Sequence, residues 1–122
     1  MAIYQLGAIE SRFADIIWKG EPISSRALVD ECAKELGWKK STTYTVLKRL
    51  IDKGIFRNEN GAVTSVISRD EFYSEQSKQF VDESFSGSLP AFLAAFTSRK
   101  KLSAEEIDSL RRIVSEYEEK EK

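Results

Sequence analysis

The stretch that decides the interpretation of this chain is Ser41-Thr42-Thr43-Tyr44-Thr45-Val46-Leu47-Lys48-Arg49-Leu50-Ile51-Asp52-Lys53-Gly54. At about 100° per residue it predicts one helix with two different faces. The apolar face holds Thr43, Val46, Leu47, Leu50 and Ile51. The opposite face has hydroxyls, then cations, and no acid before Asp52; its residues are Ser41, Thr42, Thr45, Lys48 and Arg49. This composition favours an anionic partner and suits a DNA major groove, although an ordinary amphipathic helix with a basic surface would look similar.

Two helices are expected before this stretch. The first covers residues 6–18, and its inner side is predicted to hold Leu6, Ile9, Phe13, Ile16 and Ile17. Ser24 is a good N-cap for a second helix over residues 25–36, and Gly37 a good C-cap. Its inner side is predicted to hold Ala27, Leu28, Cys32 and Leu36. With Ser41 capping the third helix, the second and third helices form a helix-turn-helix, although a plain helical hairpin would look similar.

A β-hairpin is predicted directly after the third helix. Residues 55–58 have strand character, residues 59–61 contain the Asn-Gly turn signal, and residues 62–68 are rich in β-formers. A helix-turn-helix followed by a hairpin indicates a winged helix. The wing residues expected to contact DNA are Arg57, Asn58 and Asn60; the alternative is a hairpin that only covers the core.

The distribution of charge agrees with a DNA-binding surface. The net charge is −1, but residues 38–58 contain six Lys and Arg against one acid, Asp52. Such a local basic patch matters more than the total. We expect phosphate contacts from Lys39, Lys40, Arg57 and the helix N-terminus at Ser24 and Ser25. Base-edge contacts are expected mainly from Thr42, Thr45 and Arg49, with Lys48 near the backbone or a guanine.

Three amphipathic helices follow the hairpin. They start near Arg69, Leu89 and Ser103, where Ser103 and Glu106 form a capping box. A segment of about 50 residues is too short to bury the apolar faces of all three helices by itself. Most homo-oligomers are two-fold dimers. We therefore expect a homodimer rather than helices folded back on the first domain. Its interface is predicted to hold Phe80, Phe85, Leu89, Phe92, Leu93, Phe96, Ile107, Leu110, Ile113 and Val114.

Several functional classes are disfavoured. The chain has no histidine and one cysteine, which removes His-dependent nucleophiles and the common His-based metal sites, and it has no phosphate-binding glycine motif. We expect no enzyme activity, metal or cofactor. Cys32 is interpreted as a small core or boundary residue, with redox sensing as the alternative. Residues 1–5 do not resemble a signal peptide and no long apolar run exists, so we expect a cytoplasmic protein without membrane contact.

The chain resembles the BlaI/MecI/CopY family of bacterial transcriptional repressors, which regulate penicillinase, methicillin resistance and copper transport. The resemblance is carried by Ile16-Ile17-Trp18, by residues 41–54, by Phe85-Ser86-Gly87-Ser88-Leu89, by Phe96 and by Leu102-Ser103-Ala104-Glu105-Glu106-Ile107. It implies a winged helix, a helical dimerisation region and repression through a palindromic operator. It also implies that Thr42, Thr45, Lys48 and Arg49 face the DNA.

Three departures from the family pattern bear on regulation. Ala62 follows the wing glycine, where the family often has a basic residue. The C-terminal cysteine motif of the copper-responsive members is missing, so copper sensing by that route is excluded. The β-lactam-responsive members are cleaved by a sensor protease at an Asn-Phe bond, and the corresponding pair here is Ala95-Phe96.

These observations predict a mainly α protein with a small β-wing. A winged helix-turn-helix domain is expected over residues 1–70 and a helical dimerisation region over residues 71–122. The expected function is a repressor that binds a palindromic double-stranded operator as a homodimer, with a sensor protease as a further candidate partner. The alternative is a winged-helix protein-interaction module that does not bind DNA.

Overall fold

The computed structural model describes residues 6–121. Residues 1–5, for which no signal peptide is expected, lie outside the described residues. The chain divides into two compact units, Met1–Gln79 and Phe80–Lys122. The division falls further along the chain than the expected boundary after residue 70. The reason is that Phe72, early in the fourth helix, is fully buried in the core of the first unit.

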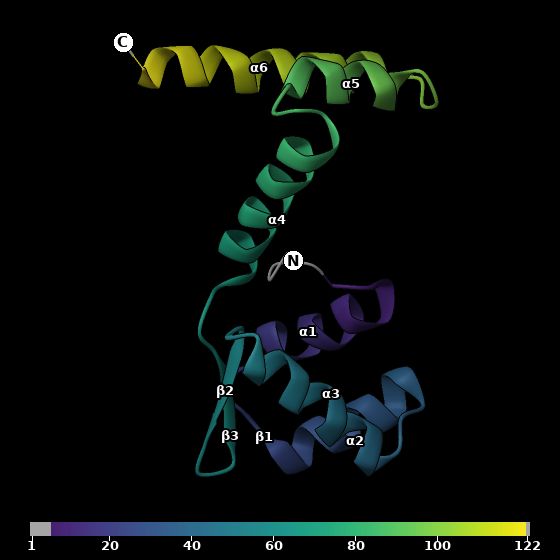
Figure 1. Ribbon diagram of the computed structural model, residues 1–122, viewed down its shortest axis with the longest axis vertical. Coiled ribbons are helices and arrows are strands. Elements are labelled where there is room, and N and C mark those ends of the chain that lie inside the picture. The colour runs from purple at the N-terminus through teal and green to yellow at the C-terminus, as the bar shows by residue number, and fades with distance from the viewer. Residues whose placement is uncertain (1–5, 122) are drawn as a thin grey trace. The chain divides into compact units, whose positions relative to one another are not determined.

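The first unit is a winged helix (Figure 1). Its elements are α1 (Ala8–Gly20), β1 (Ile23–Ser24), α2 (Ser25–Leu36), α3 (Lys40–Asp52), β2 (Phe56–Glu59), β3 (Ala62–Ser65) and the first part of α4 (Arg69–Ser84). Helices α2 and α3 follow one another with a short connection, and the β2–β3 hairpin follows α3. The fold class expected from the sequence is therefore confirmed.

Local sequence signals explain where α2 begins and ends. The Ser24 hydroxyl oxygen accepts a hydrogen bond from the Ala27 amide at 3.0 Å, which satisfies an amide that the helix leaves unpaired. Gly37 ends the helix in the left-handed conformation, with φ of 68°, where glycine has no steric penalty.

The start of α3 differs from the sequence prediction. The N-cap is Lys39, with extended backbone angles and no side-chain cap, and Lys40 is already helical; Ser41 as the cap was wrong. The N-cap is the last residue with an extended backbone, which is Lys39. The threonine hydroxyls near the start of α3 do not cap amides but donate to carbonyls of the helix itself. Thr43 donates to the Lys39 carbonyl at 3.3 Å, and Thr45 donates to the Ser41 carbonyl at 2.9 Å.

The hairpin is joined by the predicted Asn-Gly turn. Glu59 pairs with Ala62, and the two residues between them, Asn60 and Gly61, have φ of 54° and 84°. Positive φ at both positions is the requirement of a type I′ turn, whose twist matches that of the strands. Strand β3 ends at Ser65, earlier than the expected residue 68.

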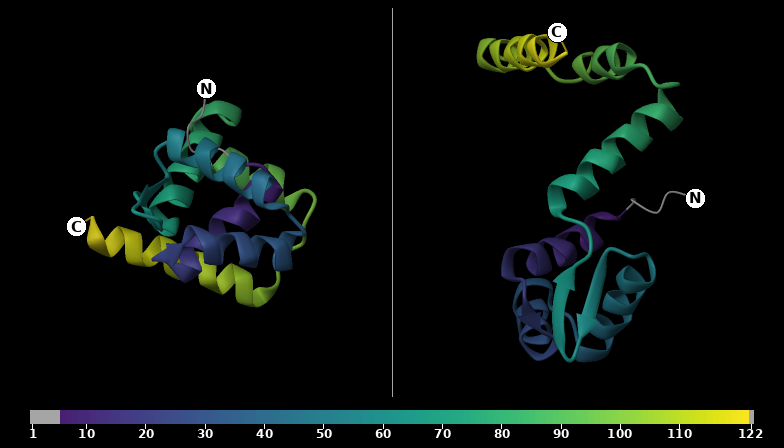
Figure 2. Two further views of the ribbon diagram at one scale, coloured as in Figure 1. Left: turned by 90° about the horizontal axis from the view of Figure 1, so that it is seen from below. Right: turned by 90° about the vertical axis from the view of Figure 1, so that its left-hand side faces the viewer.

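A third strand, β1, was not predicted. It pairs antiparallel with β3, with Ile23 opposite Val63, so the strand order is β1-β3-β2. Two residues are too few to show the alternation by which a strand is recognised in a sequence. Figure 2 shows the hairpin beside α1 and α3.

The core of the first unit draws on every helix and on the hairpin. The buried apolar residues are Phe13, Ala14, Ile17, Leu28, Cys32, Val46, Leu47, Leu50, Ile55, Phe56, Val63, Ile67 and Phe72. Two expected inner residues were wrong: Ile9 is 50% exposed and Ala27 is exposed. At about 100° per residue, Ala27 points away from the side of its helix that buries Leu28 and Cys32, and Ile9 lies at the margin of the side that buries Phe13, Ala14 and Ile17. Trp18 closes one edge, and its indole nitrogen donates to the Ile67 carbonyl at 3.1 Å.

The second unit contains the end of α4, α5 (Leu89–Thr97) and α6 (Ala104–Lys120). Ser88 caps α5 through the Ala91 amide. Ser103 and Glu106 form the predicted capping box at the start of α6. Neither α5 nor α6 contains a buried residue. Among residues 6–121, no helix has the length and apolar character that crossing a membrane requires.

Candidate nucleic-acid interface

Helix α3 has one buried face and one exposed face, as the sequence predicts. Thr43, Val46, Leu47 and Leu50 are buried in the core of the first unit. The predicted DNA-facing residues are all exposed: Ser41, Thr42, Thr45, Lys48 and Arg49. A helix held by its apolar side thus presents hydroxyls and cations to solvent.

Two further cations lie at the start of α3. Lys39 and Lys40 are both exposed. The Lys40 ammonium lies 5.9 Å from the centre of the Tyr44 ring, a distance at which a cation and a ring still attract each other weakly. Positive side chains beside the unpaired amides of a helix N-terminus can attract phosphate.

Arg49 has a partner that the sequence does not reveal. Its Nη1 lies 3.1 Å from Oε2 of Glu10 in α1. The other carboxylate oxygen of Glu10 accepts from the Gly7 amide at 3.3 Å, so Glu10 holds the first turn of α1 and Arg49 together. The outer face of α3 has no acid of its own before Asp52, but Glu10 of α1 places a carboxylate at its edge.

The protonation of Glu10 reflects this position. Partial burial raises its pKa, but the Gly7 amide and the Arg49 and Lys53 cations outweigh burial and lower the pKa below its usual value. Glu10 therefore carries its negative charge at neutral pH beside Arg49.

Lys48 has a weaker internal partner. Its Nζ lies 3.4 Å from Oδ2 of Asp52, one turn further along α3. The two side chains are 78% and 66% exposed, and such an exposed pair contributes only about 0–1 kcal/mol. Lys48 can therefore exchange this carboxylate for a phosphate at little cost.

The N-terminus of α2 is less open than expected. The Ser24 oxygen is occupied by the Ala27 amide, and the Ser25 amide donates to the Gly61 carbonyl at 2.8 Å. The Ser25 amide is thus already paired with the hairpin turn. Ser24 and Ser25 connect α2 to the wing, and this contact was not visible in the sequence because Ser25 and Gly61 lie 36 positions apart.

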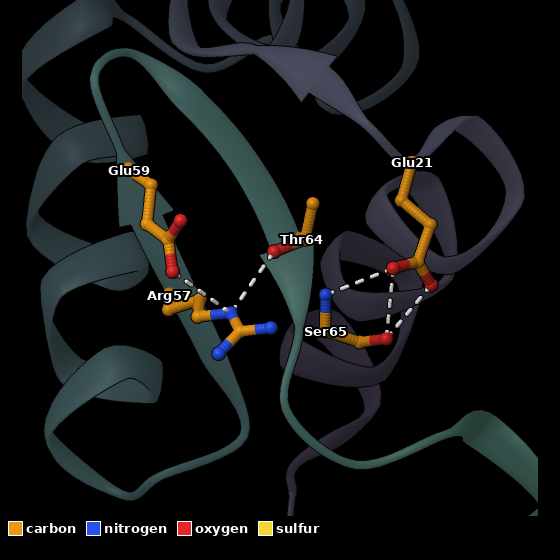
Figure 3. Close-up of polar contacts among 5 residues, drawn as sticks. All are labelled: Glu21, Arg57, Glu59, Thr64 and Ser65. Carbon is orange, nitrogen blue, oxygen red and sulfur yellow. Dashed lines mark hydrogen bonds and ion pairs between the residues drawn. The ribbon is translucent and has the colours of Figure 1, made fainter.

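The three expected wing residues are exposed, but their polar groups also shape the hairpin. Arg57 Nε lies 3.3 Å from Thr64 Oγ1 and 3.4 Å from Glu59 Oε1 (Figure 3). The Asn58 side-chain oxygen accepts from the Gly61 amide at 3.0 Å, and Asn60 adopts the left-handed turn conformation. Part of the positive charge of the wing is therefore offset by Glu59.

The base of the wing is fixed to the segment after α1. The Glu21 carboxylate accepts hydrogen bonds from both the amide and the hydroxyl of Ser65, at 2.9 and 2.8 Å (Figure 3). Charged acceptors make the stronger hydrogen bonds. Glu21 is a second residue that the sequence did not single out, because its partner lies 44 positions away.

The predicted dimerisation residues form an uncovered apolar surface in the second unit. The rings of Phe80, Phe85 and Phe92 pack with centroids 5.6 to 6.0 Å apart. A groove of about 500 Å³ between α5 and α6 is lined by Phe92, Leu93, Phe96 and Leu110, among others. Leu89, Ile107, Ile113 and Val114 are 56%, 37%, 62% and 58% exposed.

Cys32 has the character of a core residue. It is fully buried and forms no disulfide. Burial raises the pKa of its thiol to about 11, against the opposing effect of the Thr43 hydroxyl. A thiol of this kind is a poor nucleophile. Within residues 6–121, no group of acids and Cys32 has the arrangement of a metal site.

Comparison with known proteins identifies the family. The family model described as penicillinase repressor matches residues 6–116. The chain belongs to the penicillinase repressor family. It is 29% identical to the penicillinase repressor of Bacillus licheniformis, over 98% of this chain and 97% of that protein. It is 26% identical to the methicillin resistance regulatory protein MecI of Staphylococcus aureus strain Mu50, over 92% and 94% of the two chains.

Membership of the penicillinase repressor family confirms the expected class of function. The chain is a transcriptional repressor rather than an enzyme. The match covers both units, from α1 into α6. DNA binding follows from the family.

Proposed function

We propose that this member of the penicillinase repressor family acts in the cytoplasm as a homodimer that binds a palindromic operator. The observation that carries the proposal is the outer face of α3, where Ser41, Thr42, Thr45 and Lys48 are exposed while the inner face is buried. In a winged helix, the helix exposed in this way lies in the major groove. The hairpin then lies beside the adjacent backbone.

The proposed contacts divide between the backbone and the bases. Lys39, Lys40 and Arg57 are exposed and contact phosphates. Thr42 and Thr45 lie toward the base edges, and Lys48 reaches a phosphate or a guanine. The pairing of Arg49 with Glu10 places it at the edge of α3, so we assign Arg49 to the DNA backbone and not to a base.

The dimer is supported by the apolar surface of the second unit. Ile113 and Val114 remain more than half exposed, and α5 and α6 bury no residue in the single chain. A contiguous exposed apolar patch marks an interaction site. A second copy offers the same patch, and a two-fold dimer fits a palindromic operator.

A sensor protease is a further proposed partner, by analogy with the β-lactam-responsive repressors that the chain resembles. Ala95 and Phe96 are both exposed on α5. Since Ala95 stands where those repressors have asparagine, such a protease would recognise Phe96 without it. Mass spectrometry of the protein from induced cells tests this, because cleavage there yields a fragment that ends at Ala95.

DNA binding is tested by gel shift with mixed genomic duplexes at several salt concentrations. We expect binding that weakens steeply with salt, because phosphate contacts release counterions. Lys40→Ala should weaken binding to all duplexes alike and reduce the slope of log affinity against log salt by about 1.

The matched control is Lys101→Ala, which removes the same charge from an exposed position in the second unit. It should leave both affinity and slope unchanged. If the wild type does not bind duplex DNA even at low salt, the first unit is a protein-interaction module instead.

A further inference from the structure

Three side chains on the outer face of α3, those of Thr45, Lys48 and Arg49, have polar partners within the protein. The Thr45 hydroxyl donates to the Ser41 carbonyl at 2.9 Å. Arg49 donates to Glu10 at 3.1 Å, and Lys48 contacts Asp52 at 3.4 Å. A helix that reads guanine needs Arg or Lys donors free to reach O6 and N7.

These three contacts differ in how firmly they are held. Lys48 and Asp52 are both more than 60% exposed, so water or a phosphate can replace either partner. Glu10 is 20% exposed and Arg49 54% exposed, so solvent screens this pair less than it screens Lys48 and Asp52, and Glu10 is also fixed by the Gly7 amide. Arg49 is thus held at the edge of α3.

Thr45 is exposed on this face, but its hydroxyl cannot donate a hydrogen bond to DNA while it donates to Ser41. A helical threonine that donates its proton to the carbonyl four residues earlier has no proton left for a base acceptor. It presents a methyl group and the lone pairs of its oxygen. In the major groove, a threonine methyl is complementary to the C5-methyl group of thymine.

We propose that Thr45 recognises a thymine in the operator through contact between its methyl group and the C5-methyl of the base. This inference rests on the proposed function, because it requires that α3 enters the major groove. It makes Thr45 a specificity-determining residue that acts by apolar contact. The opposing possibility is that the Thr45 oxygen accepts from an adenine or cytosine amino group.

The test combines changes in the protein and in the DNA. A duplex is first selected from a random pool by wild-type protein, and each thymine is then replaced singly by uracil, which lacks only the 5-methyl group. One replacement should weaken wild-type binding by about fourfold, the effect of removing one methyl from contact. Affinities are measured by gel shift at fixed salt.

Two variants of Thr45 separate its methyl from its hydroxyl. Thr45→Val keeps a methyl at this place and should retain both the affinity and the sensitivity to uracil. Thr45→Ser keeps the hydroxyl and should bind the thymine duplex about fourfold more weakly. It should also no longer distinguish thymine from uracil at that one position.

The control is Thr97→Ser in α5. Thr97 is exposed and donates to the Leu93 carbonyl at 2.8 Å, so this change removes a methyl from the same kind of helical threonine outside α3. Thr97 lines the groove between α5 and α6, so light scattering first checks that the variant remains a dimer. Thr97→Ser should then leave affinity and uracil sensitivity unchanged. Circular dichroism checks that all variants keep their helix content.

Different results overturn different statements. If Thr45→Val loses affinity while Thr45→Ser keeps it, the oxygen reads the base and the inference is wrong. If no uracil replacement affects the wild type, the inference is also wrong, but the selected sequence still supports an operator-binding repressor. If no sequence is selected at all, the proposed function fails together with the inference.

Discussion

At the scale of single residues, Glu10 makes one local contact and one distant contact. It accepts from the Gly7 amide in its own helix and pairs with Arg49, 39 positions away. The distribution of residues along α3 was sufficient to predict which side chains are exposed. It could not predict that one of them is held by a carboxylate from α1, because sequence periodicity describes one helix at a time.

The ion pair between Glu10 and Arg49 predicts a pH-dependent contribution to stability. The pKa of Glu10 is lowered in the folded protein, so its contribution is present above the unfolded pKa and is lost as the pH falls through the folded pKa. Glu10→Gln should lower the free energy of unfolding by about 0.5–1 kcal/mol near neutral pH, since Arg49 is 54% exposed. Urea denaturation measures this difference.

Measuring the stability of Glu10→Gln at neutral and acidic pH shows whether the charge of Glu10 is responsible. The difference from wild type should disappear in acid, when the carboxyl group of the wild type is protonated. The matched control is Glu75→Gln in α4, an exposed residue without an ion pair among the described residues. A loss of stability that is equal at neutral and acidic pH would show that Glu10 acts through packing rather than charge.

At the scale of elements, the sequence predicted helices better than strands. Helix ends carry explicit signals, such as Ser24 and Gly37 around α2 and the Ser103 capping box of α6. The hairpin turn was equally explicit. Strand β1 was missed because its two residues form a strand only when β3 lies beside them, and this is a tertiary condition.

The wing turn makes a direct prediction. Gly61 has φ of 84°, and a Cβ added there would meet no atom within 4 Å. The cost of Gly61→Ala is therefore conformational, about 1–2 kcal/mol in the free energy of unfolding. Asn60→Gly, at the neighbouring position with φ of 54°, should be nearly neutral because glycine adopts this conformation freely. Equal stabilities of the two variants in urea denaturation would argue against the type I′ turn.

At the scale of the whole molecule, the two units differ in how completely they bury their apolar side chains. The first has a core of fully buried residues such as Phe13, Phe56 and Phe72. The second has rings in contact but buries no residue of α5 or α6. The sequence was sufficient to predict the winged helix and the apolar faces of α5 and α6. An apolar face does not, however, identify the surface that packs against it.

The oligomeric state is tested through a residue that is exposed in the single chain. Ile113 is 62% exposed, so Ile113→Asp should cost the isolated unit little stability while placing a charge in the proposed interface. Light scattering at micromolar concentration should give the wild type twice the 13.9 kDa chain mass and the variant the single mass. Operator binding should weaken with it, because each half-site would then be bound separately.

Arg112→Asp is the control for this substitution, since it introduces the same side chain one residue earlier on the polar side of α6 and changes the charge by more. It should remain a dimer. A wild type that scatters as a single chain would remove the dimer from the proposed function. A dimer that persists in Ile113→Asp would instead locate the interface away from α6, because a charge cannot be buried there without a partner.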